Sequence, residues 1–513
     1  MTTRPNILFL LSDEHSFRFL SARSYEDGGE PCRTPTLDGL IDKGVHFDAA
    51  YCQMPLCTPS RISMLCGRHS HRCGAWSNNS ILPPDLPTFS SHLGDNGYAT
   101  CTVGKMHLGG SLQHAGFQDR PYGDFGGPCS HQEDPLQTDE DTMRSRTVDA
   151  GLSQVPEALL QEQMVARQSL AWLRQQRHTD PDKPWLLMAS FSRPHFPLTA
   201  PSRFLDRYHP EGAPPPRTGR SGDSAEHPMT KGAVKGFRTE EIEAEEGRKA
   251  RAAYFACVDQ LDEILGDFLA LLQRDGLLDN TVIVYSSDHG EMAGEHGLWW
   301  KNTWHESSAR VPFIVSTPAH RRGDLPAQQV DTPVSLADLF PTFCGLAGIK
   351  PPPGLDGVDL SQILNGNDSP QLQDRPGVVT EAVIPRWGQG TEFRLARSAR
   401  YKYVLFSDVP DLAFDLLEDP LEQHNIAATD NPQVAAELAH LRNHLLDGFS
   451  FADATQTRQR QSTQLKEQYP ARVQPQTPNQ ILRGDGQLVE ADQPLYQARV
   501  VSPDPAADFD DFT

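Results

Sequence analysis

Four short apolar runs along the chain are each followed at once by polar, chemically capable side chains. The runs are 6–11, 98–103, 185–191 and 281–285. They are continuous rather than alternating, which is typical of strands buried on both faces of a parallel sheet. Because ligands in such folds bind beyond the carboxyl ends of the strands, we expect the polar residues that follow the runs to lie near one another.

Segments with helical periodicity separate the apolar runs. The clearest is followed by Gly276, a plausible helix stop. Its apolar positions, spaced by three or four residues, are Tyr254, Val258, Leu261, Leu265, Phe268 and Leu272. Strands that alternate with helices predict an α/β fold with a large, mostly parallel (mixed) sheet flanked by helices.

Composition divides the chain into three parts. Residues 210–237, rich in Pro, Gly and charge, are typical of an irregular insertion, and the Pro-rich stretch 351–357 precedes a domain boundary. The predicted parts are an α/β domain over 1–375, a small α+β subdomain over 376–450 and an extended polar arm over 451–513. The middle part has an antiparallel meander over 394–406 and 412–417, closed by a helix over 434–446.

Charge and cysteine usage narrow the class of protein. The 513 residues carry a formal net charge of −22, which argues against a nucleic-acid partner because phosphate binding requires a basic face. No stretch approaches the roughly 20 apolar residues that span a bilayer, and the run 7–11 is too short for a signal-peptide core. Nine cysteines, an odd number, favour free thiols. We therefore expect a cytoplasmic protein with no membrane partner.

The residues around Cys57 predict a nucleophile at an anion-binding helix end. Thr58 suits the N-cap and Pro59 the first helical position, with the helix ending near Gly67. Free amides at a helix N-terminus favour an anion. The guanidinium of Arg61, one turn on, can hold a tetrahedral oxyanion through two bonds. The alternative is a buried structural thiol.

The phrase Cys57-Thr58-Pro59-Ser60-Arg61, continuing to Leu65-Cys66-Gly67, resembles the C-x-P-x-R signature of the type I sulfatases. These formylglycine-dependent enzymes belong to the alkaline phosphatase superfamily. Other family landmarks follow in the same order, over about residues 4 to 446. They are Asp13, Gly104-Lys105-Met106-His107, Pro194-His195, Asp288-His289-Gly290, Lys301 and the stretches 334–342 and 414–420. Cys66 departs from the Thr or Ala that is more usual in the family.

The resemblance implies an alkaline-phosphatase-like fold and a sulfuric ester hydrolase that releases inorganic sulfate from a small organic sulfate ester. In that family the cysteine, here Cys57, is oxidised to formylglycine, whose hydrate attacks sulfur. A formylglycine-generating enzyme would therefore be a maturation partner. The alcohol part of the substrate, whether choline, aryl or sugar, is left open.

The resemblance also implies a divalent-metal site. The matching ligands are Asp13, Glu14, Asp288 and His289. Three carboxylates suit Ca²⁺, whereas the imidazole of His289 is also compatible with Mn²⁺.

The remaining roles carried over by position are catalytic and substrate-binding. Arg61, Lys105 and Lys301 would neutralise the sulfate. A protonated His195, with Lys301, would give a proton to the leaving alkoxide, and His107 would take one from the hydrate. The matching substrate-binding position is Asn78. His305, close to Lys301 in the sequence, is a candidate for contact with the alcohol.

Two alternatives remain open at this point. Phosphonate monoester and phosphodiester hydrolases of the same superfamily use a similar constellation, and His289 is compatible with them. A non-catalytic zinc-binding protein would instead use the two thiols and two imidazoles between Cys66 and Cys73, although their spacing is not a usual zinc pattern. The polar arm suggests a homo-oligomer.

Overall fold

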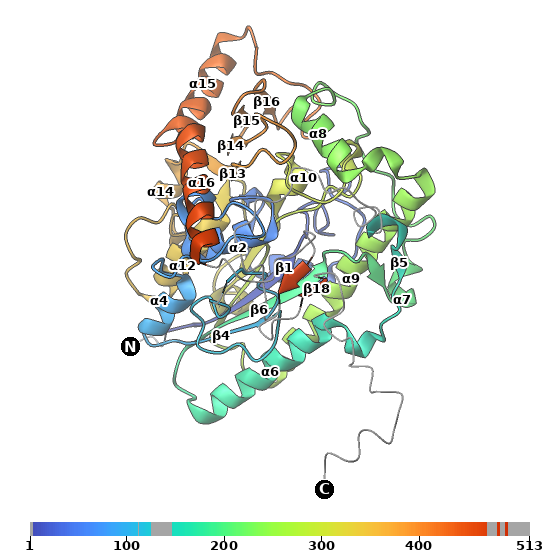
Figure 1. Ribbon diagram of the computed structural model, residues 1–513. Helices are drawn as coiled ribbons and strands as arrows, with labels where there is room; N and C mark the ends of the chain where they lie inside the picture. The colour runs from blue at the N-terminus through green and yellow to red at the C-terminus, as the bar shows by residue number, and fades with distance from the viewer. Residues whose placement is uncertain (1–3, 111, 125–145, 469–479, 483–487, 491–513) are drawn as a thin grey trace.

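A seven-stranded mixed sheet forms the centre of the molecule, as Figure 1 shows for the computed structural model, which describes residues 4–110, 112–124, 146–468, 480–482 and 488–490. The strand order is β11-β2-β10-β8-β1-β6-β4. The strands are β1 Asn6–Asp13, β2 Val45–Phe47, β4 Ala99–Gly104, β6 Trp185–Pro194, β8 Thr281–Ser287, β10 Phe313–Ser316 and β11 Gln328–Val330. The four predicted runs are β1, β4, β6 and β8. They pair in parallel with one another, while β10 is antiparallel to β8 and β2.

Each face of the sheet carries its own apolar core, which explains the continuous apolar run of β1. Ile7 and Phe9 pack with α2 (Cys57–Cys66), α4 (Phe89–Asp95) and α12 (Leu339–Ala347). Leu8 and Leu10 pack on the opposite face with α6 (Gln161–Thr179) and α9 (Ala244–Arg274). Since successive side chains of a strand point to opposite faces, both sets must be apolar. The predicted helix is part of α9.

A second, antiparallel sheet of four strands follows, in the order β13-β14-β15-β16. Its strands are β13 Val378–Ala382, β14 Phe393–Arg397, β15 Tyr401–Phe406 and β16 Leu412–Asp415, and α15 (Pro432–Leu446) packs on it. The last three strands and the helix match the predicted meander and closing helix. Strand β13 was not predicted. It carries Glu381, a charged residue that is buried because it forms an ion pair with Arg394 on β14. The sequence of β13 alone does not show this partner.

Two segments are more regular than the sequence suggested. The insertion 210–237 ends in helix α8 (Pro228–Phe237), and the arm expected to be extended from 451 begins with helix α16 (Phe451–Gln468). Helix α16 contains neither Gly nor Pro, and its Gln461 accepts a 2.6 Å hydrogen bond from the Trp76 indole. Beyond 468 the arm lies outside the described residues, apart from the paired strands β17 (Gln480–Leu482) and β18 (Leu488–Glu490).

The shorter elements connect these units. The strands are β3 Ala50–Tyr51, β5 Gly151–Leu152, β7 Thr199–Ala200, β9 Arg310–Val311 and β12 Val334–Ser335. The helices are α1 Pro35–Ile41, α3 Ser70–Cys73, α7 Ser202–Leu205, α10 Glu306–Ala309, α11 Pro318–Arg322, α13 Ser361–Leu364 and α14 Pro370–Gln373. Within the described ranges, every helix is too short or too polar to cross a membrane.

Candidate active site

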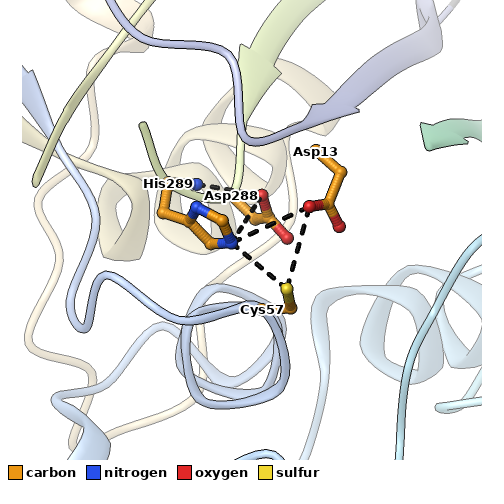
Figure 2. Close-up of side chains that lie close together, drawn as sticks. All are labelled: Asp13, Cys57, Asp288 and His289. Carbon is orange, nitrogen blue, oxygen red and sulfur yellow. Dashed lines mark hydrogen bonds and ion pairs between the residues drawn. The ribbon is translucent and has the colours of Figure 1, made fainter. Parts of the chain in front are cut away.

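The polar residues that follow the parallel strands converge at one edge of the sheet, as predicted. Asp13 ends β1, and Asp288 and His289 follow β8 directly. Figure 2 shows these three side chains turned toward Cys57, which lies at the start of helix α2. All four residues are fully buried.

Helix α2 begins two residues earlier than predicted, at Cys57 instead of Pro59. Its N-cap is Leu56, in extended conformation and without a side-chain cap, rather than Thr58. The Thr58 hydroxyl instead donates to the carbonyl oxygens of His107 (2.5 Å) and Asn78 (3.3 Å). The side-chain oxygen of Asn78 accepts from the Thr58 N–H at 3.2 Å, so a residue from a separate loop satisfies this free amide. The helix ends at Gly67, as predicted, where φ is +63°.

Arg61, which the sequence analysis expects to hold a substrate oxyanion, is bonded in this structure to protein groups. Its Nε donates to Asp288 at 2.7 Å and its Nη2 to Asp13 at 2.9 Å. Its Nη1 donates to the Lys105 carbonyl oxygen at 2.6 Å and to the Ser190 hydroxyl at 2.9 Å. The guanidinium therefore holds two carboxylates in fixed positions.

The carboxylates of Asp13 and Asp288 have opposite electrostatic surroundings. Burial opposes ionisation of Asp13, but Lys105, His195 and Arg61 hold its pKa well below the usual range. Burial and the neighbouring Asp13 raise the pKa of Asp288. The Asp13 Oδ1 atom lies 3.8 Å from His289 Nε2 and 3.7 Å from Cys57 Sγ. The ligand atoms of Asp13, Asp288, His289 and Cys57 all lie within 4.8 Å of one another, and together these side chains form a cage in which one metal ion could contact all of them.

A divalent metal fits this donor set. His289 Nδ1 hydrogen-bonds to the Gly290 carbonyl oxygen, so its Nε2, 3.7 Å from Asp288 Oδ1 and 3.2 Å from Cys57 Sγ, is the nitrogen that faces the cage and would bind a metal. Burial lowers the pKa of His289, but Asp288 and Cys57 raise it to about 9, so metal binding would displace a proton. Glu14 Oε1 is a buried acceptor with no hydrogen-bond partner, as expected of a ligand atom. The donor set is compatible with Ca²⁺ and with Mn²⁺.

Two lysines flank the cage. Lys105 Nζ lies 2.9 Å from Asp13, and Lys301 Nζ lies 2.8 Å from Glu14. Although burial raises the pKa of the Cys57 thiol, these two lysines and His289 lower it well below its ordinary value. The surroundings of Cys57 therefore stabilise negative charge on the atom at this position.

The two candidate proton carriers also lie here. His195 Nδ1 hydrogen-bonds to the Phe196 carbonyl oxygen at 2.8 Å, and its Nε2 lies 3.4 Å from Glu14. Burial, Lys105 and Lys301 lower the pKa of His195 to about 3, so the protonated form expected from the sequence is not favoured in the free site. His107 also lowers the pKa of the Cys57 thiol, and its buried Nδ1 has no hydrogen-bond partner among the described residues.

The two predicted substrate contacts have other partners. Asn78 caps α2, as described above. His305 is buried and stacks on Trp304, with ring centroids 3.7 Å apart, while its Nδ1 lies 3.3 Å from the Thr303 hydroxyl. Its ring is 4.4 Å from that of His296. These contacts are with its own loop and not with the residues around Cys57.

The zinc alternative is not supported by the geometry. Among the described residues, the groups of side chains spaced to hold a metal ion centre on Asp13, and none includes Cys66 or Cys73. His71 Nδ1 is instead bonded to Glu381 at 2.8 Å.

Some site residues were missed from the sequence. Glu291 is buried and accepts the N–H groups of Ala293 and Trp300, each at 2.7 Å. Glu291 could have been predicted as a site residue, because it stands only two residues after His289 in the sequence. Ser190, which accepts a hydrogen bond from Arg61, lies within an apolar run, and nothing in the sequence indicates its role.

Comparisons with known proteins agree on one family. The family model described as Sulfatase matches residues 5–349, and the model described as N-sulphoglucosamine sulphohydrolase, C-terminal, matches residues 294–448. A choline-sulfatase of Rhizobium meliloti is 31% identical over 460 residues, covering 86% of each chain. An arylsulfatase K of Danio rerio is 27% identical, covering 86% of this chain and 84% of its own.

Solved structures share the fold. A phosphonate monoester hydrolase of Agrobacterium radiobacter superposes with a TM-score of 0.70 at 23% identity, covering 95% of this chain and 99% of its own. A protein solved in complex with D-glucosamine-2-N,6-O-disulfate superposes with a TM-score of 0.69 at 23% identity, covering 90% and 99%.

Proposed function

This chain belongs to the sulfatase family and is a sulfuric ester hydrolase, and we propose that its nucleophile derives from Cys57 and that Asp13, Glu14, Asp288 and His289 hold its divalent metal. The observation that carries the proposal is the buried cluster of Cys57, Asp13, Asp288 and His289 at the N-terminus of α2. Bound there, the metal would supply Lewis acidity, and the formylglycine form of Cys57 a nucleophilic oxygen, as in the family.

Arg61 acts on the site through other residues. It orients Asp13 and Asp288 by one ion pair each, and a third and fourth donor fix it to Lys105 and Ser190. With all these donors used inside the protein, Arg61 is a positioning residue rather than a direct contact of the sulfate.

Lys105 and Lys301 are the cations that bind the sulfate oxygens. Each is paired with a candidate metal ligand, Asp13 or Glu14. If those carboxylates bound a metal ion, their negative charge would no longer balance the two ammonium groups, and the buried site would have an excess of positive charge. An anionic sulfate ester offsets that excess, which favours its binding and stabilises the charge that develops in the reaction.

His195 and His107 move the protons. His195 is neutral in the free site, and a bound anion raises its pKa, because a nearby negative charge favours the protonated imidazole. It can then donate from Nε2 to the leaving oxygen. His107, which lowers the pKa of the thiol at position 57, accepts a proton from the residue at that position.

The test is to produce the chain together with a formylglycine-generating enzyme. We expect mass spectrometry to find Cys57 converted to the aldehyde or its hydrate, and the purified protein to hydrolyse 4-nitrophenyl sulfate. Cys57→Ala should abolish the hydrolysis. Cys101→Ala, which alters a buried thiol of β4, should retain it. Faster hydrolysis of 4-nitrophenyl phenylphosphonate than of the sulfate would refute the proposed preference for sulfate esters.

A further inference from the structure

One loop concentrates buried polar atoms that have no hydrogen-bond partner among the residues that the structure describes. In the segment from 296 to 305, five residues that are at most 5% exposed have such side-chain atoms. They are His296 Nδ1, Trp300 Nε1, Asn302 Oδ1 and Nδ2, Trp304 Nε1 and His305 Nε2. Buried polar groups are nearly always hydrogen-bonded, so this concentration calls for a ligand.

Asn302 is the strongest case, because both ends of its amide are unpartnered and it is 2% exposed. Its backbone lies next to the nucleophile. The Asn302 N–H donates to the carbonyl oxygen of Pro55, two residues before Cys57, at 2.9 Å. It also directly follows Lys301, whose ammonium lies 2.8 Å from Glu14.

Trp300 flanks Lys301 on the other side. Its indole N–H is unpartnered, and its ring centroid lies 5.0 Å from that of Phe237. Both Trp300 and Asn302 have φ of +65°, a conformation that non-glycine residues adopt at a cost and that is concentrated at functional sites. The loop is held by Trp387, after β13, whose indole donates to the Asn302 carbonyl oxygen at 2.7 Å. This bond ties the loop that follows β8 to the segment that follows β13.

We propose that Asn302 and Trp300 bind the alcohol part of the sulfate ester, and that this alcohol carries hydroxyl groups, as a sugar does. The inference rests on the proposed function. An amide offers two donors and one acceptor oxygen, which neighbouring hydroxyls can satisfy together. The indole N–H of Trp300 supplies one more donor.

A choline-like or plain aryl alcohol fits the same groups poorly. Neither a trimethylammonium nor an unsubstituted ring can hydrogen-bond, so the amide would stay unpaired when the ligand excludes water, which is costly. Nearby aromatic faces also carry cations already. The Arg146 guanidinium lies 3.6 Å from the Phe196 ring centroid and 5.7 Å from that of Trp300, and Lys301 Nζ lies 5.1 Å from Phe196. These positive charges disfavour a second cation at those rings.

The experiment compares substrates on the matured enzyme. The probes are glucose 6-sulfate, N-acetylglucosamine 6-sulfate, galactose 4-sulfate, choline sulfate and 4-nitrophenyl sulfate. We expect kcat/KM for the best sugar sulfate to exceed that for choline sulfate by at least about 100-fold, because a site built to bind hydroxyls rejects ligands that lack them. A value for choline sulfate equal to or above that of every sugar sulfate overturns the inference.

Asn302→Leu, which keeps the shape of the side chain and removes its hydrogen bonds, tests the residue itself. We expect a loss of about 10- to 100-fold in kcat/KM for the best sugar sulfate and a change below about threefold for 4-nitrophenyl sulfate. The matched control is Gln260→Leu on α9, which alters another buried amide with both ends unpartnered and should leave both values unchanged. The inference is overturned if Asn302→Leu lowers kcat/KM equally for both substrates, or for neither. Either result would indicate that the Asn302 amide binds trapped water instead of the substrate.

Stability and a second variant separate recognition from folding. Because the Asn302 amide makes no hydrogen bond to any described residue, Asn302→Leu should not lower the thermal midpoint of the free enzyme. If Asn302→Leu does not fold, Trp300→Phe serves as the second test. It replaces the indole by a smaller ring without an N–H group, and it should lower kcat/KM selectively for sugar sulfates. Failure of the proposed function gives a different result, since the matured wild type would then leave 4-nitrophenyl sulfate intact as well.

Discussion

Replacing Arg61 should show how much this residue contributes to the stability of the fold through the carboxylates of the cage. Arg61 pairs with two carboxylates, Asp13 and Asp288, and all three side chains are at most 1% exposed. Removing one partner of a buried ion pair costs about 3–5 kcal/mol, because the remaining charge is left uncompensated. We therefore expect Arg61→Met to lower the free energy of unfolding by about 3–5 kcal/mol. Lysine keeps the charge but reaches only one carboxylate, so Arg61→Lys should cost about 2–3 kcal/mol.

The measurement is denaturant unfolding followed by tryptophan fluorescence. Both variants are made on a Cys57→Ala background, so that maturation of Cys57 has no influence. A saturating divalent cation should restore part of the loss in Arg61→Met, because the metal takes over the two carboxylates.

Arg375 provides the matched control. It pairs through both Nη atoms with the buried Asp338, at 2.6 and 2.9 Å, and neither residue belongs to the candidate metal site. Arg375→Met should therefore also destabilise the fold, but without rescue by the metal. The reasoning is refuted if Arg61→Met is as stable as its parent, or if the cation rescues both variants equally.

Three further predictions address the metal, the acid stability and the start of α2. Chelation by EDTA should abolish hydrolysis of 4-nitrophenyl sulfate, and adding back Ca²⁺ or Mn²⁺ separately should identify the metal; activity that survives chelation contradicts the metal site. Burial opposes ionisation of Glu306, but Lys402 and two arginines lower its pKa from 4.5 to about 2, so its ionisation stabilises the fold above pH 4.5 and this contribution is lost as pH falls towards 2. Glu306→Gln should therefore flatten the dependence of stability on pH in that window, and an unchanged acid-unfolding curve would argue against it. Asn78→Ala should cost about 1 kcal/mol of stability through the lost bond to Thr58, with KM for 4-nitrophenyl sulfate unchanged, whereas a raised KM would indicate contact with the sulfate.

Sequence reasoning succeeded where a local pattern decides the structure. The run of β1 is apolar throughout because its alternate residues face two separate cores, and the spacing within α9 follows one buried helical face. The order of strands along the chain then placed Asp13, Lys105 and Asp288 at one edge of the sheet. The family landmarks identified the same residues independently.

The errors share a cause, which is contact between residues distant in sequence. Thr58 has good N-cap chemistry, but carbonyl groups from two other loops take its hydroxyl. The two carboxylates that pair with Arg61 lie 48 and 227 residues away along the chain, and neither ion pair was predicted. Strand β13 forms around a buried Glu381 whose counter-ion lies on β14. Periodicity contains no information about such partners.

The complete burial of Cys57 has a consequence for the order in which folding and oxidation of this thiol can occur. The side chains that enclose it come from positions as far apart as 13 and 301, so the enclosure closes only after most of the chain has been made and folded. An enzyme that oxidises this thiol needs access to it, and has that access only before the sheet is complete. Timing during synthesis then decides which chemistry the finished protein has. A molecule that folds first keeps its thiol for as long as it remains folded.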